Sequence, residues 1–246
     1  MKNISIIGSG SWGSALGIHL AHLGNNVKIW SYSQEEADLI NNEKKCKFLP
    51  LATIPDGVVC TTDFKTAIEG TEMLLIVTPS KFVRETIQKF KQYVTDQEII
   101  ICSKGFEEST LYTLNEVVEE ELPNCKIGGL SGPSHAEEVS LEIPTALVIA
   151  SEDDKLLKDV QSTFMNEALR IYTSYDIKGA ELGGALKNII AFLLITVCAF
   201  AYGVPLSAEN SNNSVSDTAK AAAVQGSTAA EYSYADYCKE YSGADA

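Results

Sequence analysis

The chain has 246 residues, of which 19 are lysine or arginine and 33 are aspartate or glutamate, so its formal net charge is −14. Hydrophobic residues make up 45% of the sequence and charged residues 21%, which is typical of a folded protein with a buried core. The acidic balance argues against a surface that binds nucleic acid or an anionic membrane. Because domains usually hold about 100–200 residues, we expect one full domain and part of a second.

Cysteine and histidine are placed in ways that argue against disulfide and metal sites. The six cysteines form no Cys-x-x-Cys pair, so most are expected to be buried small side chains in a reducing compartment. The three histidines lie at no ligand spacing, and we expect no metal. Met1–Gly13 indicates a strand followed by a glycine turn and not a signal peptide, which favours the cytoplasm.

Short apolar runs alternate with amphipathic segments of helical length. The expected strands are Asn3–Ile7, Val27–Trp30, Val58–Thr61, Met73–Thr78, Glu98–Cys102, Lys126–Leu130, Thr145–Ala150 and Leu169–Thr173. The expected helices are Trp12–Leu23, Gln34–Asn41, Phe64–Glu69, Lys81–Tyr93, Leu111–Glu121 and Asp153–Asn166. Such alternation predicts an α/β fold of the Rossmann type, with a doubly wound parallel sheet covered by helices on both faces.

A glycine-rich turn follows the first expected strand and opens the first helix. Gly8, Gly10 and Gly13 form a GxGxxG pattern in the setting that this pattern requires. The first glycine allows a tight turn, the second lets the backbone approach a diphosphate, and the third lets helix and strand pack closely. The free N–H groups of the helix N-terminus attract anions, so we expect a bound dinucleotide.

The sequence does not separate NAD from NADP. The position that usually reads the adenosine ribose lies about 20 residues after the turn, where this chain has Trp30–Ser33. Neither a carboxylate for a 2′-hydroxyl nor an arginine for a 2′-phosphate stands there. The coenzyme is therefore left open.

Three further strands end in polar or turn residues, namely Thr78–Ser80, Ser103–Gly105 and Ser131–Ser134. Because ligands bind at the carboxyl ends of strands in open α/β sheets, these segments are expected to converge near the dinucleotide, with Lys104 as their cation. Ser134–Glu137 has the pattern of a capping box and predicts a helix that starts there.

The chain divides into three parts. We expect a dinucleotide-binding domain over 1–178, the first helix of an all-α second domain over 179–206, and an acidic flexible tail over 207–246. Small residues at helical spacing after Gly179 predict a closely packed helix. The uncharged run 189–206 favours a buried helix, with a membrane span as the alternative. Lys187 is either a partly desolvated lysine suited to proton transfer or an ordinary surface lysine.

Together these segments resemble the bacterial type of NAD(P)-dependent glycerol-3-phosphate dehydrogenase. The resemblance runs from Met1 to Ala191 and is carried by GSGSWGSALG at 8–17, VKIW at 27–30, INNEKKCKFLP at 40–50, LLIVTPS at 74–80, SKGFE at 103–107, LSGPSHAEEV at 130–139, PTALVIAS at 144–151 and YTSYDIKGAELGGALKNIIA at 172–191. The last three stretches are the most specific, because few other dehydrogenases join GPSxAxE to a downstream ExGGALKN.

The resemblance implies roles for individual residues. Those assigned to NAD or NADP are Gly8, Gly10, Ser11, Trp12, Gly13, Tyr32, Ser33, Phe48, Lys104 and Ala136. Those assigned to the substrate, glycerol 3-phosphate or dihydroxyacetone phosphate, are Lys104, Gly132, Ser134 and Lys187. Lys104 and Lys187 are the catalytic pair, with Lys187 as proton acceptor when glycerol 3-phosphate is oxidised. The product would feed glycerophospholipid biosynthesis.

The sequence departs from the family at two places. Tyr32 and Ser33 stand where the family usually has an arginine. The last arginine is Arg170, so the Arg-Asn cluster of the family's helical domain is not found after Ala191, and that domain looks truncated or divergent. Two alternatives therefore stay open: a catalytically impaired dinucleotide-binding remnant, or a related hydroxy-acid or ketopantoate-type dehydrogenase. We expect a small-molecule substrate, no nucleic acid and no membrane span, and we leave a homodimer open.

Overall fold

The computed structural model describes residues 1–186 and Leu193. The strands are β1 Asn3–Ile7, β2 Asn26–Trp30, β3 Lys45–Cys46, β4 Leu49–Thr53, β5 Val58–Thr61, β6 Met73–Ile76, β7 Glu98–Ile101, β8 Ile127–Ser131, β9 Thr145–Ala150 and β10 Leu169–Ser174. The α-helices are α1 Ser11–His22, α2 Gln34–Asp38, α3 Phe64–Ile68, α4 Val83–Phe90, α5 Leu114–Glu121, α6 Ala136–Ser140 and α7 Asp154–Phe164. A further helix covers residues 177–186.

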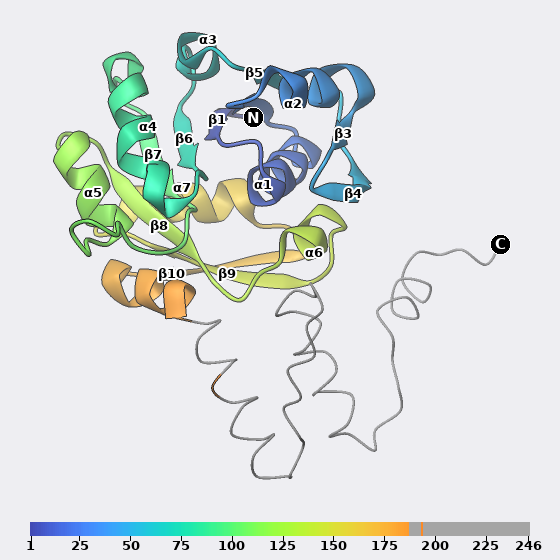
Figure 1. Cartoon of the computed structure of the whole chain (residues 1–246). Helices are drawn as coiled ribbons and strands as arrows, with labels where there is room; N and C mark the ends of the chain where they lie inside the picture. The colour runs from blue at the N-terminus through green and yellow to red at the C-terminus, as the bar shows by residue number, and fades with distance from the viewer. Residues whose placement is uncertain (187–192, 194–246) are drawn as a thin grey trace, which may run out of the picture. The chain divides into compact units, whose positions relative to one another are not determined.

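The central element is an eight-stranded sheet in the order β10-β9-β8-β7-β6-β1-β2-β5 (Figure 1). From β5 to β8 all neighbours are parallel, with Ile4–Ile7 of β1 paired to Val27–Trp30 on one side and to Met73–Ile76 on the other. The chain winds outward from β1 in both directions, so the strand order reverses beside β1. This is the doubly wound Rossmann order, and the predicted fold class is confirmed.

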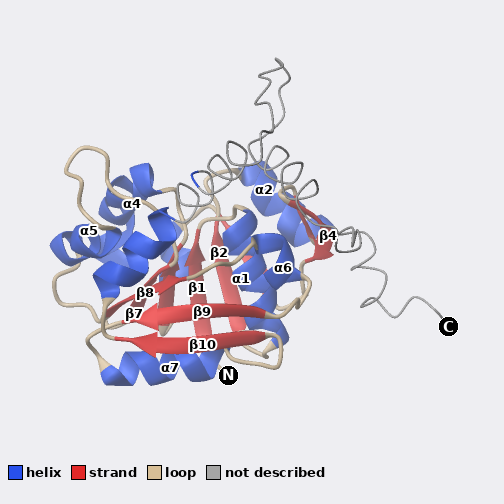
Figure 2. Ribbon diagram, turned by 90° about the horizontal axis from the view of Figure 1, so that it is seen from below, coloured by secondary structure: helices blue, strands red, loops and turns tan. Residues whose placement is uncertain are grey.

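Helices cover both faces of this sheet, because its central strands are apolar on both sides (Figure 2). One buried cluster joins β1, β2 and β9 to α1, α6 and α7, with Leu16 and Phe164 among its largest side chains. The other joins β6 and β7 to α3, α4 and α5, with Phe90 at its centre. A ligand site is expected at the carboxyl ends of the parallel strands.

The sheet is not parallel throughout, which corrects the sequence-based expectation. β9 runs antiparallel to β8, and β10 then runs parallel to β9. A parallel connection from β8 would require a long crossover, whereas residues 132–144 contain only the short helix α6, which packs against α1. The chain therefore enters β9 at the end of the sheet where it left β8.

Two local elements between β2 and β5 differ from the sequence-based prediction. The small hairpin β3–β4 was not predicted, and the helix that begins with α2 continues as a π-helix over Leu39–Glu43. The described thiols are free, and Cys46, Cys60 and Cys102 are buried as expected, while Cys125 is half-buried. The uncharged run 189–206 and the acidic tail lie outside the described residues, and the domain boundaries remain predictions.

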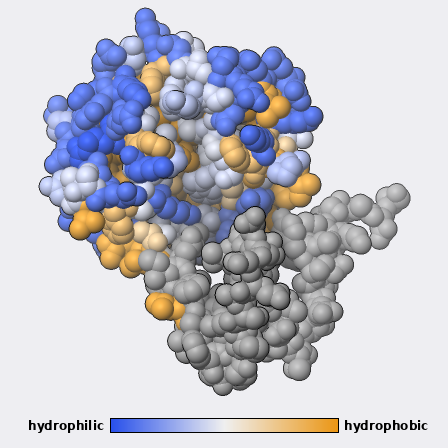
Figure 3. All heavy atoms as spheres, in the orientation of Figure 1, coloured by the Kyte–Doolittle hydropathy of each residue, from blue (hydrophilic) through white to orange (hydrophobic). Residues whose placement is uncertain are grey.

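Charged groups between α4 and α5 form an ion-pair cluster on the protein surface, in a region where hydrophilic residues gather (Figure 3). The Arg84 guanidinium donates to Glu107 from Nε at 2.7 Å and from Nη2 at 2.9 Å. It also pairs with Glu120 and Glu121. Hydrogen bonds from Arg84 hold the pKa of the Glu107 carboxyl below its usual range. This cluster fixes the loop between β7 and α5.

Candidate functional site

The glycine turn between β1 and α1 is shaped partly by the protein's own packing. Gly8 has a φ of +131°, and a Cβ atom there would lie 3.1 Å from the carbonyl group of Val77. A Cβ atom at Gly13 would overlap the carbonyl oxygen of Gly8. The first and third glycines are therefore required for the close approach of α1 to β1 and β6.

Gly10 differs from its two neighbours in the motif. It is the N-cap residue of α1, and a Cβ atom built on it would meet no atom within 4 Å. The packing of the described residues therefore does not require glycine here, whereas a diphosphate approaching the helix N-terminus would. The first turn of α1 contains no acidic side chain that would repel such a group. The turn thus fits a dinucleotide.

A cavity of about 370 Å³ lies beside this turn, at the carboxyl ends of β6 and β7. Its lining includes residues from four segments that are distant in the sequence: Ser11, Trp12, Val77, Thr78, Pro79, Cys102, Ser103, Lys104, Ser134, His135, Ala136 and Glu137. Five of the residues assigned by resemblance are thereby brought together, namely Ser11, Trp12, Lys104, Ser134 and Ala136.

The loops after β6 and β7 are tied to each other below this cavity. The Ser103 hydroxyl lies 2.5 Å from the carbonyl oxygen of Thr78 and 3.2 Å from that of Ile76, as donor. A Cβ atom at Gly105 would lie 2.9 Å from Ser80 Oγ, so the two loops are also in close contact. Two of the three polar strand ends predicted to converge are thus held together.

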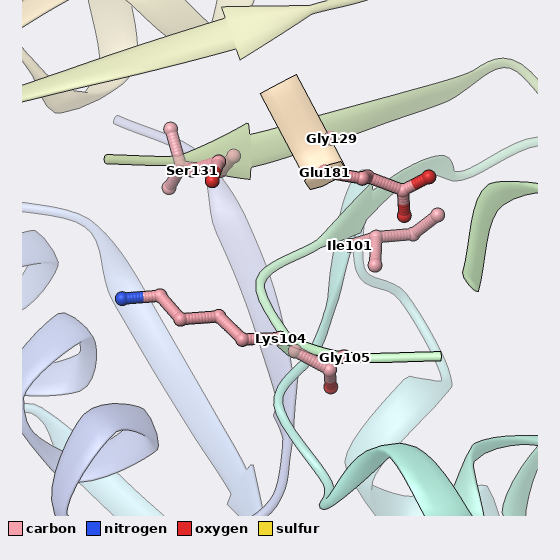
Figure 4. Close-up of a pocket in the computed structure, with 8 residues that line it drawn as sticks. Ile101, Lys104, Gly105, Gly129, Ser131 and Glu181 are labelled. Carbon is pink, nitrogen blue, oxygen red and sulfur yellow. The ribbon is translucent and has the colours of Figure 1, made fainter. Parts of the chain in front are cut away.

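Lys104 provides the positive charge of the cavity. Its Nζ atom lies 5.4 Å from the ring centroid of Trp12, within the range of a cation–π interaction. Figure 4 shows the Lys104 side chain extending away from Ile101 and Glu181. The ammonium therefore lies on the side of the loop that faces α1 and the glycine turn.

The third strand end, after β8, forms a tight turn rather than the predicted capping box. Gly132 has a φ of +152°, and the Ser134 N–H donates to the Gly132 carbonyl at 3.0 Å. Because of this turn α6 begins one residue later than expected, with His135 as its N-cap and no side-chain capping bond. The capping-box prediction is wrong, but Ser134 is buried at the cavity and a short helix does follow.

The end of β2, where the sequence predicted the adenosine ribose, lies beside a carboxylate that sequence reasoning missed. Glu36 of α2 accepts a hydrogen bond from Ser9 Oγ at 2.5 Å and another from Ser31 Oγ at 3.2 Å. Ser33 caps α2 by accepting from the Glu36 N–H at 3.4 Å. The spacing Ser33-x-x-Glu36 was the available signal, since it places the glutamate in the first helical turn, beside the end of β2.

The other residues assigned to this end differ in exposure. Tyr32 is 89% exposed, while Phe48 is 47% exposed and lines a smaller cavity together with Ser9 and Glu36. Lys45 and Lys47 line the same cavity. The structure therefore places Phe48 near the glycine turn, whereas Tyr32 is almost fully exposed to solvent.

Another carboxylate, that of Glu181, is buried close to the loop that carries Lys104. Glu181, on the helix over 177–186, accepts a hydrogen bond at Oε1 from the N–H of Asn115 at 3.1 Å. Its Oε2 atom has no donor within the described part of the chain. Burial raises the pKa of Glu181 to about 7. A Cβ atom at Gly184 would overlap Ser131 Oγ, so this helix does pack closely, as the small residues predicted.

Two expectations cannot be placed within the described residues. Lys187, the predicted proton acceptor, lies outside them. The predicted pairing of Lys187 with Lys104 therefore stays a prediction. Within the part of the chain that is described, no helix has the length and apolar character needed to cross a bilayer.

Comparison with known proteins assigns this arrangement to a family. A family model described as the NAD-dependent glycerol-3-phosphate dehydrogenase N-terminus matches residues 3–157. A glycerol-3-phosphate dehydrogenase [NAD(P)+] of Agathobacter rectalis is 41% identical over 205 residues, covering 82% of this chain and 61% of the relative. A relative of the same name from Fusobacterium nucleatum is 43% identical over 196 residues, covering 78% and 58%.

The fold comparison agrees with the sequence comparison. A crystal structure of glycerol-3-phosphate dehydrogenase from Coxiella burnetii matches with a TM-score of 0.76 at 31% identity, covering 92% of this chain and 66% of that chain. The chain spans about three fifths of the length of the curated relatives that it matches. On the family model and these relatives, the chain belongs to the NAD-dependent glycerol-3-phosphate dehydrogenase family.

Proposed function

We propose that this chain acts in an NAD(P)-dependent oxidoreductase that interconverts sn-glycerol 3-phosphate and dihydroxyacetone phosphate. The observation that carries the proposal is the cavity in which Trp12, Lys104 and Ser134 meet beside the glycine turn. The family and the names of the relatives support the same reaction. Its place in the cell would be the supply of glycerol 3-phosphate for glycerophospholipid biosynthesis in the cytoplasm, by one subunit or a homodimer.

The residues of the glycine turn would hold the diphosphate. Gly10 leaves room for the two phosphates, and the N–H groups of Ser11 and Trp12 at the start of α1 would donate to them. Ala136 would contact the dinucleotide in the cavity that it lines, and Phe48, which is half-exposed beside Ser9 and Glu36, would contact it from the surface. When bound, the dinucleotide would accept a hydride in the oxidation of glycerol 3-phosphate and donate one in the reduction of dihydroxyacetone phosphate.

Lys104 would bind the substrate and stabilise its charge. Its ammonium lies at the cavity, where it can attract a phosphate group and stabilise negative charge that develops on the reacting oxygen. Gly132 and Ser134 would complete the substrate site from the turn after β8. The substrate would then lie between that turn and the loop of Lys104, where Ser134 and Lys104 line the same cavity.

Lys187 would move the proton. In the oxidation of glycerol 3-phosphate it would accept the proton of the reacting hydroxyl, and in the reduction of dihydroxyacetone phosphate it would return a proton to the carbonyl oxygen. Holding both the proton donor and the substrate in place accounts for much of the rate gain expected of such a site.

The test is an assay of the purified full chain with dihydroxyacetone phosphate, using NADH and NADPH side by side. We expect oxidation of the nucleotide that depends on dihydroxyacetone phosphate and is lost in Lys187→Ala, while dinucleotide binding is retained. Binding without turnover in the wild-type chain would favour the impaired remnant over the enzyme. Turnover of hydroxy acids or ketopantoate instead would indicate the related dehydrogenases.

A further inference from the structure

We infer that Glu36 is a specificity-determining residue, which makes this chain select NAD over NADP. The inference rests on the dinucleotide site of the proposed function, and it goes beyond it by assigning the coenzyme. It is carried by one juxtaposition: the Glu36 carboxylate from α2 is fixed between Ser9 of the glycine turn and Ser31 at the end of β2. The sequence motif alone left this choice open.

The carboxylate is held by two buried hydroxyl groups. Ser9 Oγ and Ser31 Oγ lie 2.8 Å from each other, and both donate toward the Oε2 atom of Glu36. Ser31 is fully buried and Ser9 is 7% exposed. The Ser33 N–H in turn donates to Ser31 Oγ at 3.1 Å, which fixes that hydroxyl. Glu36 is thus pre-positioned rather than a freely rotating surface side chain.

The position of this carboxylate is where a Rossmann fold reads the adenosine ribose. That ribose lies beside the glycine turn and the end of the second strand, here Ser9 and Trp30–Ser31. In many such folds the acid comes directly from the strand end, whereas here the strand end supplies serines and the acid comes from the next helix. In this chain the acidic contact to the ribose therefore comes from Glu36 of α2, which Ser9 and Ser31 hold in place.

One oxygen of the carboxylate remains able to accept hydrogen bonds from a ligand. No described residue donates to Oε1 of Glu36, since the hydrogen bonds from Ser9 and Ser31 both reach Oε2. A ribose with free 2′- and 3′-hydroxyl groups offers donors for such an oxygen. A 2′-phosphate offers only acceptors and about two negative charges, which a fixed carboxylate repels. The arrangement therefore favours the unphosphorylated ribose.

Two lysines beside Glu36 would favour NADP instead, because an ammonium group attracts a 2′-phosphate. Lys45 and Lys47 line the same small cavity as Glu36, and both are exposed. Lys45 is paired with Glu43 at 3.3 Å, with 68% of its side chain exposed. Solvated ammonium groups on flexible side chains attract a phosphate only weakly, whereas Glu36 is fixed by buried partners. The carboxylate is therefore expected to dominate the choice.

The experiment measures binding of NAD⁺, NADH, NADP⁺ and NADPH to the full chain by calorimetry, without substrate. In the wild type we expect NAD(H) to bind about 10- to 100-fold more tightly than NADP(H). Glu36→Gln keeps the shape and removes the charge, so this ratio should fall about tenfold, mainly through tighter binding of NADP(H). Glu35→Gln is the matched control, because Glu35 is the exposed neighbour on α2 and its substitution should leave the ratio unchanged.

The outcomes separate the inference from the proposed function. Equal binding of the two coenzymes by the wild type, or an unchanged ratio in a folded Glu36→Gln variant, would overturn the inference. Tighter binding of NADP(H) than of NAD(H) by the wild type would also overturn it. If Lys47→Gln then abolished this preference, the lysines and not Glu36 would determine the coenzyme. If dinucleotides bind with the expected ratio but no substrate turns over, the proposed function fails and the inference stands. If no dinucleotide binds, both fail.

The same affinity ratio is also measured in Glu36→Ala and Ser31→Ala, so that the test does not rest on Glu36→Gln alone. Removing the carboxylate should lower the NAD-to-NADP ratio as Glu36→Gln does. Ser31→Ala keeps the charge but removes one hydroxyl partner, so an intermediate ratio is expected. The melting temperature of each variant shows whether it is folded. A ratio in Ser31→Ala below that of Glu36→Gln would contradict a role for the charge itself.

Discussion

The ammonium group of Lys104 lies 5.4 Å from the ring centroid of Trp12, and this contact joins the loop after β7 to the first turn of α1. Trp12 follows the glycine turn, and Lys104 is the residue that the resemblance assigns to both the dinucleotide and the substrate. Their contact therefore places the Lys104 ammonium next to the first turn of α1, at the cavity that both residues line.

The first prediction follows from this contact. Lys104→Met keeps much of the apolar side chain but removes the charge, so turnover of dihydroxyacetone phosphate should fall about 100-fold or more. Dinucleotide binding should change only a few-fold, because the glycine turn is unaltered. Steady-state kinetics and calorimetry measure the two effects. Lys81→Met is the matched control, since Lys81 makes a similar contact with Phe82 at 4.7 Å outside the cavity.

Much of the fold could be predicted because its signals are local. β1, the glycine turn, α1 and β2 follow one another with clear periodicity, and the structure gives them nearly the expected bounds. The antiparallel direction of β9 could not be predicted, because it depends on how the short helix α6 packs against α1. The hairpin β3–β4 was missed because β3 has only two residues and because a proline, Pro50, lies within β4.

The candidate site was predictable to a similar degree. The polar strand ends near Lys104 were expected to converge, because parallel strands carry their carboxyl ends to one edge. Glu36 was missed because its partners Ser9 and Ser31 come from two other segments, and no spacing rule links the three. The start of α6 was misplaced because the turn at Gly132 sets it, which the capping pattern does not show.

The second prediction compares two glycines of the same motif. Gly10→Ala should leave the free energy of unfolding within about 1 kcal/mol, because its Cβ would meet no described atom. It should nevertheless weaken dinucleotide binding about tenfold or more, since the methyl group occupies the space for the diphosphate. Chemical denaturation and calorimetry measure the two quantities.

Gly13→Ala is the counterpart of Gly10→Ala in this comparison. Its Cβ would overlap the Gly8 carbonyl oxygen, so α1 must move away from β1 and the chain should lose about 2 kcal/mol or more of stability. Equal stability losses at Gly10 and Gly13 would show that the protein's own packing, and not a ligand, requires the second glycine.

The third prediction concerns the ion pairs that fix the loop of Lys104. Arg84→Met leaves the Glu107 carboxylate, whose side chain is only 12% exposed, without its two-pronged partner. The free energy of unfolding should fall by about 1–3 kcal/mol, as is usual when one member of such a pair is removed. Lys89→Met removes the exposed pair with Glu85 and should cost less than about 0.5 kcal/mol. Urea denaturation distinguishes the two variants.

The fourth prediction concerns the buried carboxyl of Glu181, whose pKa burial raises from 4.5 to about 7. A raised pKa means that the folded chain holds this proton more tightly than the unfolded chain does. The contribution to stability is therefore fully present below pH 4.5 and is lost as the pH rises toward 7. At higher pH the buried carboxylate is charged, and its Oε2 atom has no donor among the described residues.

Glu181→Gln removes this titration while its amide oxygen can still accept from the Asn115 N–H. Between pH 5 and pH 8 the wild type should lose stability relative to the variant, by up to about 3 kcal/mol. Urea denaturation of both proteins at several pH values measures the difference, with Glu152→Gln as an exposed control that should follow the wild type. Plots of the free energy of unfolding against pH that run parallel for the wild type and Glu181→Gln would contradict a buried proton at Glu181. Only a group whose pKa differs between the folded and the unfolded chain makes the two plots diverge.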